Sequence, residues 1–173
     1  MATSSTRAGN RANFVSLVDI SIVIAAPPAR VLRAFFDRAA LAAWWQALAS
    51  VTTPRPFGPY VVEWRPTDFR DDILGRLGGV LRGTVIQIDP GEGFLLADVY
   101  WLPPDGDPIG PMAIEITTRK APPDPEHPVD DELTLLRIHQ TGFEDSPRWR
   151  RFYATFGAGW ERAVQTMKGL LER

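Results

Sequence analysis

The side chains that most often do chemistry in proteins are scarce in this 173-residue chain. The sequence contains no cysteine and only two histidines, His127 and His139. These counts exclude a thiolate zinc centre, an iron–sulfur cluster, a cysteine nucleophile and a three-histidine site within one chain. Strand alternation predicts that His139 faces outward, and His127 falls in a proline-rich acidic stretch, so neither is given a catalytic role.

Acidic pairs and glycine-rich stretches add no recognisable centre. Asp71-Asp72 and Asp130-Asp131 lack the spacing of a calcium loop and are interpreted as solvated charges. The stretch GRLGG at 75–79 follows loop residues and precedes a strand, which is the wrong context for phosphate binding. The sequence therefore predicts no metal, no cofactor and no assigned catalytic residue.

Aromatic side chains are the stronger signal, because the chain has 6 Trp. Five aromatic residues fall on elements that should face one another: Trp45, Trp64, Trp101, Phe156 and Trp160. One interpretation is ordinary core packing, since tryptophan buries well in any core. We favour a cavity with aromatic walls for an apolar ligand, with open space expected beside Gly157.

Two polar residues, Arg82 and Gln140, lie on strand faces that the alternation assigns to the interior. In an apolar pocket such groups orient the polar end of a ligand. The alternative places both side chains at strand ends, in water. With the five aromatic residues they complete the predicted ligand-binding set.

Six segments have the composition and alternation of β-strands, at 18–24, 60–65, 81–89, 94–101, 112–118 and 132–141. Turns or loops join the last five directly, which predicts an antiparallel meander. The four prolines within 121–131 exclude a strand or helix interior there and predict a protruding loop.

Two regions are predicted to be helical. Residues 27–47 begin with two prolines and should break near Asp37 into two short helices. Residues 147–171 follow Ser146, a good cap for the first amides, and carry one apolar stripe about 37 Å long. Only the sheet is large enough to cover that stripe. The expected fold class is therefore α+β, with a bent sheet of about six to seven strands around the last helix; a flat two-layer arrangement is the alternative.

Composition agrees with one globular domain. Apolar residues make up 45% and charged residues 23% of the chain. Residues 14–173 are assigned to this domain and 1–13 to a disordered tail. No apolar run reaches the roughly 20 residues of a membrane span, and a net charge of −2 argues against a nucleic-acid partner.

Several short motifs occur in the order found in the START-like, helix-grip superfamily, and most resemble homologues of the activator of heat-shock-protein-90 ATPase. They are IVIAAPPARV at 22–31, LAAWW at 41–45, GTVIQIDP at 83–90, QTGF at 140–143 and GW at 159–160. The resemblance covers roughly residues 17–172 and implies a sheet that grips the C-terminal helix. It is specific for fold and weak for function, because the superfamily hosts many tasks.

Three functions remain open at this stage. The first is binding of a small hydrophobic, aromatic ligand in a cavity between the sheet and the C-terminal helix. The second is a cyclase, aromatase or hydrolase-like enzyme that uses the same cavity, and the third is a co-chaperone-like interaction module. The expected protein is cytoplasmic and a monomer or weak homodimer.

Overall fold

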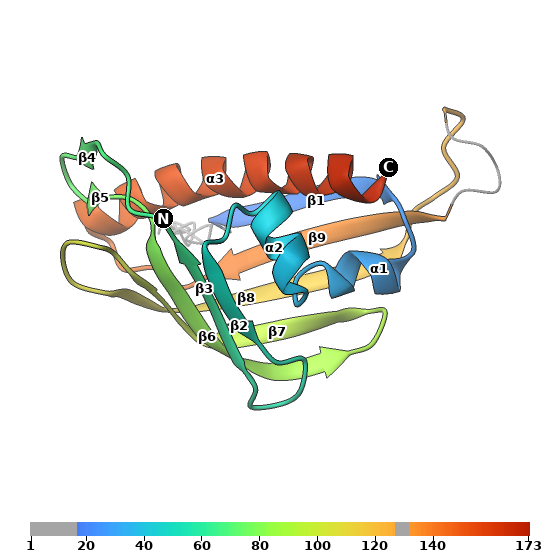
Figure 1. Cartoon of the computed structure of the whole chain (residues 1–173), viewed down its shortest axis with the longest axis horizontal. Coiled ribbons are helices and arrows are strands. Elements are labelled where there is room, and N and C mark those ends of the chain that lie inside the picture. Colours follow the sequence, from blue (N-terminus) through green and yellow to red (C-terminus); the bar gives the residue numbers. More distant parts are fainter. Residues whose placement is uncertain (1–16, 127–131) are drawn as a thin grey trace, which may run out of the picture.

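The computed structural model describes residues 17–126 and 132–173. A curled sheet holds one long helix against its concave side, with two short helices in front (Figure 1). The predicted α+β class is therefore confirmed. The expected tail at 1–13 and the end of the proline-rich loop lie outside the described residues.

Seven strands form one antiparallel sheet in the order β1-β9-β8-β7-β6-β3-β2. Pairing of β1 with β9 brings the first strand beside the last one, immediately before the long helix. A separate hairpin, β4–β5, stands between β3 and β6 in the chain. The strand bounds are β1 Val18–Ala25, β2 Ala49–Thr52, β3 Pro59–Trp64, β4 Arg70–Asp71, β5 Gly75–Arg76, β6 Gly79–Asp89, β7 Gly93–Leu102, β8 Ile109–Lys120 and β9 Leu133–Thr141.

The helices begin where the sequence predicts. Helices α1 (Pro28–Arg33) and α2 (Arg38–Trp44) are separated at Asp37, which has extended backbone and accepts a hydrogen bond from the Ala40 amide at 2.7 Å. Helix α3 (Pro147–Leu171) starts after Ser146, whose hydroxyl accepts from the Trp149 amide at 3.3 Å. Within the described residues, none of these helices has the length and apolar character needed to cross a bilayer.

All six predicted strands are present, but the sequence did not predict three short ones, β2, β4 and β5. Strand β2 is an edge strand that pairs only with β3, and its Ala49 and Ser50 carry little strand propensity. Strands β4 and β5 have two residues each, too few for an alternation to show.

The predicted inward face of β6 is wrong for Arg82. The register with β7 shifts between Val85 and Gln87, which leaves Ile86 as an extra residue on β6. Because of this extra residue, the inward and outward positions of β6 exchange at Ile86. A residue assigned by alternation from the end of the strand is therefore placed on the wrong face before that point. Leu81 and Val85 are buried instead, whereas Arg82 is exposed with its guanidinium 5.3 Å from the centre of the Tyr100 ring.

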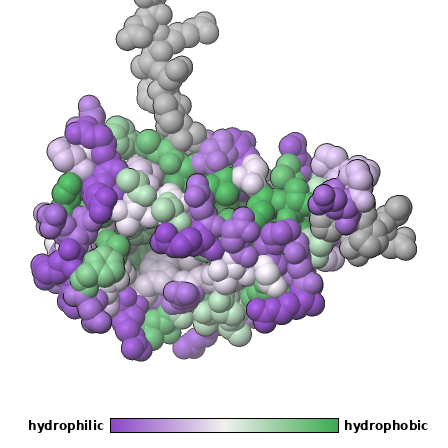
Figure 2. Space-filling model, turned by 90° about the horizontal axis from the view of Figure 1, so that it is seen from above, coloured by the Kyte–Doolittle hydropathy of each residue, from purple (hydrophilic) through white to green (hydrophobic). Residues whose placement is uncertain are grey.

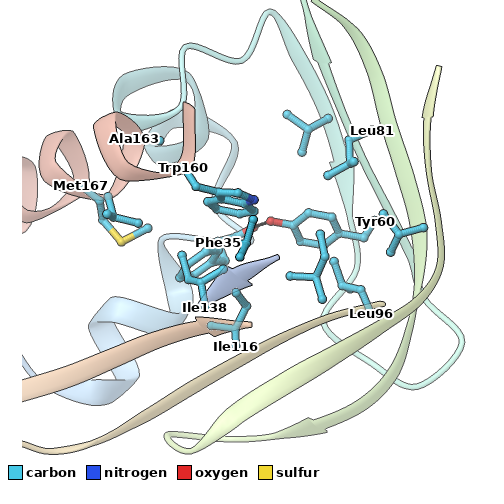
Figure 3. Close-up of a cluster of buried hydrophobic side chains, with 14 of the residues drawn as sticks. Phe35, Tyr60, Leu81, Leu96, Ile116, Ile138, Trp160, Ala163 and Met167 are labelled. Carbon is cyan, nitrogen blue, oxygen red and sulfur yellow. Dashed lines mark hydrogen bonds between the residues drawn. The ribbon is translucent and has the colours of Figure 1, made fainter. Parts of the chain in front are cut away.

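Helix α3 buries its apolar stripe against the sheet. Trp160, Ala163 and Met167 project from the helix towards the strands (Figure 3). Ile116 of β8 and Ile138 of β9 lie opposite them in the same cluster. The buried residues of the helix are Trp149, Phe152, Tyr153, Trp160, Ala163, Val164, Met167 and Leu171.

The C-terminal end of α3 is fastened by polar contacts to the first strand and helix. Lys168 donates to the Val23 carbonyl at 2.8 Å, and Arg30 donates to the Leu171 carbonyl at 2.8 Å. The Glu172 carboxylate accepts from the Ala25 amide at 2.9 Å. These contacts fix where the helix lies along its length.

Replacement of Trp160 by alanine should lower the free energy of unfolding by about 3–5 kcal/mol, the range for a buried aromatic residue. Trp160 is 5% exposed, and its indole N–H donates to the Gln140 side chain at 2.9 Å. Trp160→Phe keeps most of the packing and should cost less. Urea denaturation measures both variants, and an unchanged midpoint for Trp160→Ala would contradict the packing described above.

Candidate functional site

A cavity of about 430 Å³ opens beside α3, between that helix, the end of α2 and the β3–β6 part of the sheet. Figure 2 looks onto α3 and shows hydrophilic side chains along the exposed helix, with a hollow of near-neutral hydropathy next to it. The lining residues are Trp44, Trp45, Gln46, Trp64, Arg65, Thr67, Leu77, Gly78, Leu81, Gln140, Thr155, Phe156, Gly159, Trp160, Arg162, Ala163 and Thr166.

The lining changes from buried to exposed along the depth of the cavity. Leu81, Gln140 and Trp160 form part of a buried floor. Arg65 and Arg162 are exposed and form part of the rim. The cavity therefore has an apolar interior with one buried amide and a cationic mouth.

Four indole rings make up much of the wall, and we call Trp44, Trp45, Trp64 and Trp160 the tryptophan cluster. Trp45 stacks on Trp44 with ring centres 4.9 Å apart and planes 8° apart. It also contacts Trp64 edge-on at 5.0 Å and Trp160 at 4.6 Å. Each aromatic pair of this kind stabilises its arrangement by about 0.5–1.5 kcal/mol in addition to the gain from burial, so the rings hold one another in place.

Three indole N–H groups of this cluster are bonded within the protein. Trp44 donates to the Ala34 carbonyl at 2.9 Å, and Trp64 donates to the Trp45 carbonyl at 2.7 Å. Trp160 donates to the Gln140 side chain at 2.9 Å. These three rings therefore keep their polar edges satisfied and offer a ligand mainly apolar surface.

Gln140 is the buried polar group of the floor, at 1% exposure. Its carbonyl oxygen accepts from Trp160, and its amide nitrogen donates to the Met112 sulfur at 3.2 Å. The Gln140 side chain also hydrogen-bonds with the Tyr153 hydroxyl, so of its two N–H donors and two acceptor lone pairs, one lone pair of the carbonyl oxygen remains. The predicted inward orientation of Gln140 is confirmed; its contact with a ligand stays a prediction.

Two tyrosines near the core are neutral hydrogen-bond donors. Burial raises the pKa of Tyr153 to about 12, and its hydroxyl donates to the Gly142 carbonyl at 2.6 Å. Burial also raises the pKa of Tyr60, whose hydroxyl donates to the Phe35 carbonyl at 2.8 Å. Neither residue lines the cavity.

The structure brings five of the seven predicted site residues to the cavity: Trp45, Trp64, Gln140, Phe156 and Trp160. Trp101 lies behind the wall instead, fully buried, with its ring 4.9 Å from Phe156 and its N–H bonded to the Gly78 carbonyl at 2.7 Å. Arg82 is on the outer face of the sheet. A strand pattern identifies an inward residue, but not whether another side chain stands between it and the cavity.

Gly159 and the two rim arginines were missed by the sequence reading. The expected open space beside Gly157 is present, but Gly157 does not line the cavity, whereas Gly159 does. A Cβ atom added at Gly159 would meet nothing within 4 Å outside its own helical neighbourhood. The available signal was helical spacing, since Phe156, Gly159 and Ala163 lie on one side of α3 at intervals of three and four residues.

The β4–β5 hairpin segment forms one wall and is attached to α3 by charge. Leu77 and Gly78, which follow β5, line the cavity. Asp71 accepts from the Ile73 and Leu74 amides, both at 3.0 Å, and from the Arg151 guanidinium of α3 at 2.7 Å. The Arg151 hydrogen bonds, helped by the Leu74 amide, lower the pKa of Asp71 to about 2.

A second hollow beside this hairpin is polar, and one of its carboxylates, Asp105, is paired with arginines. Asp105 pairs with Arg76 at 3.0 Å and with Arg70 at 3.4 Å. The Arg76 guanidinium holds the pKa of Asp105 below its usual value. Among the described residues, no cluster of histidine, aspartate or glutamate side chains is arranged to hold a metal ion.

The Asp71–Arg151 pair should make stability depend on pH in the acid range. The pKa of Asp71 is about 2 in the folded protein against 3.8 ordinarily, so its stabilising contribution is present above about pH 4 and is lost as the pH falls through 2. Urea midpoints at about pH 6 and pH 3 should differ less in Asp71→Asn than in the parent. The exposed Asp72→Asn is the control, and equal losses in the parent and Asp71→Asn would contradict the assignment.

A curled antiparallel sheet around a C-terminal helix, with two short helices after the first strand, defines the helix-grip architecture. No family model and no curated protein matches this chain. Protein MLL2253 from Mesorhizobium loti is 21% identical, with a TM-score of 0.62 over 90% of this chain and 97% of that chain. The Aha1 dimer from Colwellia psychrerythraea is 17% identical, with a TM-score of 0.55 over 90% and 95%.

A third solved structure is DynU16, from the dynemicin biosynthetic locus. It is 17% identical, with a TM-score of 0.55, and the match covers 90% of this chain but 46% of that chain. At these identities the likenesses show the fold alone. The chain therefore has the helix-grip fold and shares it with solved Aha1-type structures, so the predicted resemblance to homologues of the heat-shock-protein-90 ATPase activator is confirmed at the level of fold.

Proposed function

We propose that this protein binds a small, flat, hydrophobic molecule in the tryptophan-walled cavity. The observation that carries the proposal is a cavity of about 430 Å³ in which three of the four indole rings have their N–H groups bonded within the protein and so contribute apolar surface. That volume falls within the roughly 300–1,000 Å³ of small-molecule sites. Flat ligands are favoured because aromatic walls gain energy from stacked and edge-on ring contacts.

The chemistry of the lining favours binding over catalysis. Its described members are aromatic, aliphatic, glycine, threonine, glutamine and arginine residues. General acid–base catalysis uses a histidine, carboxylate, lysine, tyrosine or cysteine within hydrogen-bond reach of the reacting group. Arginine stays protonated and amides do not titrate, so these groups orient a ligand and do not exchange protons with it.

A cyclase or hydrolase-like role in the same cavity is the alternative enzyme reading, and the DynU16 likeness supports it only through the fold. An interaction module would use the outer surface instead. A cavity-filling variant separates the interaction module from ligand binding, because only a molecule held in the cavity is affected by it. The enzyme alternative is separated by asking whether a bound molecule is chemically converted.

Replacement of Gly159 by leucine should weaken ligand binding at least about tenfold, because a side chain added there enters open cavity space. The neutral dye N-phenyl-1-naphthylamine, whose fluorescence rises in apolar surroundings, is a suitable ligand. We expect micromolar affinity for the parent protein. Fluorescence titration measures the dissociation constant for each variant.

Gly157→Leu is the matched control. Both glycines are in α3 and both would place a Cβ in open space, but only Gly159 lines the cavity. Each change adds the same side chain and raises helix propensity by about 1 kcal/mol. If the parent fails to bind the dye, or if Gly159→Leu binds as well as Gly157→Leu, the cavity is not the binding site and a surface role takes precedence.

A further inference from the structure

We propose that the ligand is an aromatic acid whose anionic group lies at the cavity mouth between Arg65 and Arg162. This inference rests on the proposed function and names the chemical class of the ligand. It starts from the charges of the lining, because the ring contacts described above do not distinguish a neutral ligand from a charged one.

The two arginines reach the rim from different parts of the fold. Arg65 immediately follows β3, and Arg162 lies on α3 two residues after Trp160, which forms part of the floor. Both are exposed, and among the described lining residues no aspartate or glutamate accompanies them. The mouth therefore carries two positive charges that no acidic lining residue balances.

Arginines elsewhere near the site are paired. Arg151 is bonded to Asp71, and Arg76 and Arg70 are bonded to Asp105. None of the ion pairs or side-chain hydrogen bonds found among the described residues uses the guanidinium of Arg65 or Arg162. The arginines at the mouth are thus available to a ligand, while those of the hairpin wall are used to hold the wall.

The guanidinium group suits a planar anion. It presents several N–H donors in a fixed fork that matches the two oxygens of a carboxylate and equally meets a sulfonate. The aromatic body of such a ligand would lie against the tryptophan cluster, and Gln140 on the floor offers the remaining acceptor lone pair of its carbonyl oxygen. Because the mouth is exposed to water, salt should screen the arginine contacts but not the ring contacts.

Two dyes with the same ring system separate these contributions. The anion 8-anilino-1-naphthalenesulfonate carries one sulfonate, and N-phenyl-1-naphthylamine is the neutral compound without it. Both are titrated by fluorescence against the parent, Arg65→Gln, Arg162→Gln and the double variant. Arg82→Gln is the matched control, because Arg82 is also exposed but lies outside the cavity lining.

The double variant should bind the sulfonate dye about three- to thirtyfold more weakly, which corresponds to two partly exposed charge contacts. Its affinity for the neutral dye should stay within about twofold, and Arg82→Gln should change neither. Raising the salt concentration from about 0.02 M to about 0.5 M should weaken the sulfonate dye in the parent and not in the double variant. Displacement of the sulfonate dye by 2-naphthoate at a lower concentration than by the neutral 2-naphthalenemethanol would extend the result to carboxylates.

The outcomes distinguish failure of this inference from failure of the proposed function. If Gly159→Leu weakens the neutral dye but the double arginine variant binds the sulfonate dye as tightly as the parent, the cavity is a site for neutral ligands and the inference is overturned. If Gly159→Leu affects neither dye, the proposed function itself fails. Equal weakening by Arg82→Gln and by the rim variants would show a general charge effect and would also overturn it.

Discussion

One buried hydrogen bond, between the Trp160 indole and the Gln140 amide, joins helix α3 to strand β9 of the sheet. The packing of the helix and the floor of the cavity both depend on it. The N–H to oxygen distance is 2.9 Å between the donor and acceptor atoms, and both residues are buried. Loss of either partner would leave a polar atom of the other without water, which costs more than a typical exposed hydrogen bond. The contact fixes the long helix over the last strand and at the same time forms the cavity floor.

The cavity exists because small residues and an irregular sheet leave space that the aromatic rings do not fill. Gly159 has no side chain and Ala163 a small one, so this side of α3 leaves space beside it. The register shifts between β6 and β7 bend the sheet locally. The hairpin segment then closes the side wall, held by the Asp71–Arg151 pair. Stability and the candidate binding site therefore draw on the same residues, with Trp160 serving both.

Periodicity and caps predicted most of the fold. Three features depend only on residues close together in the chain, and the sequence predicted them: the apolar stripe of α3, the cap at Ser146 and the break at Asp37. Strand β2 was missed because its pairing with β3, not its composition, makes it a strand. Arg82 was placed on the wrong face because a bulge at Ile86 changes the alternation, and a bulge has no reliable sequence signature.

The sequence alone determined the fold class, the helix that the sheet grips, and the inward direction of Trp64, Gln140 and Trp160. It also indicated the aromatic character of the site. Only the tertiary structure decided that Trp101 stands behind Phe156, that Gly159 borders the cavity, and that Arg65 and Arg162 share its mouth. The reason is physical: alternation and helical spacing define which face a residue occupies, whereas packing between elements distant in the chain decides what lies in front of it.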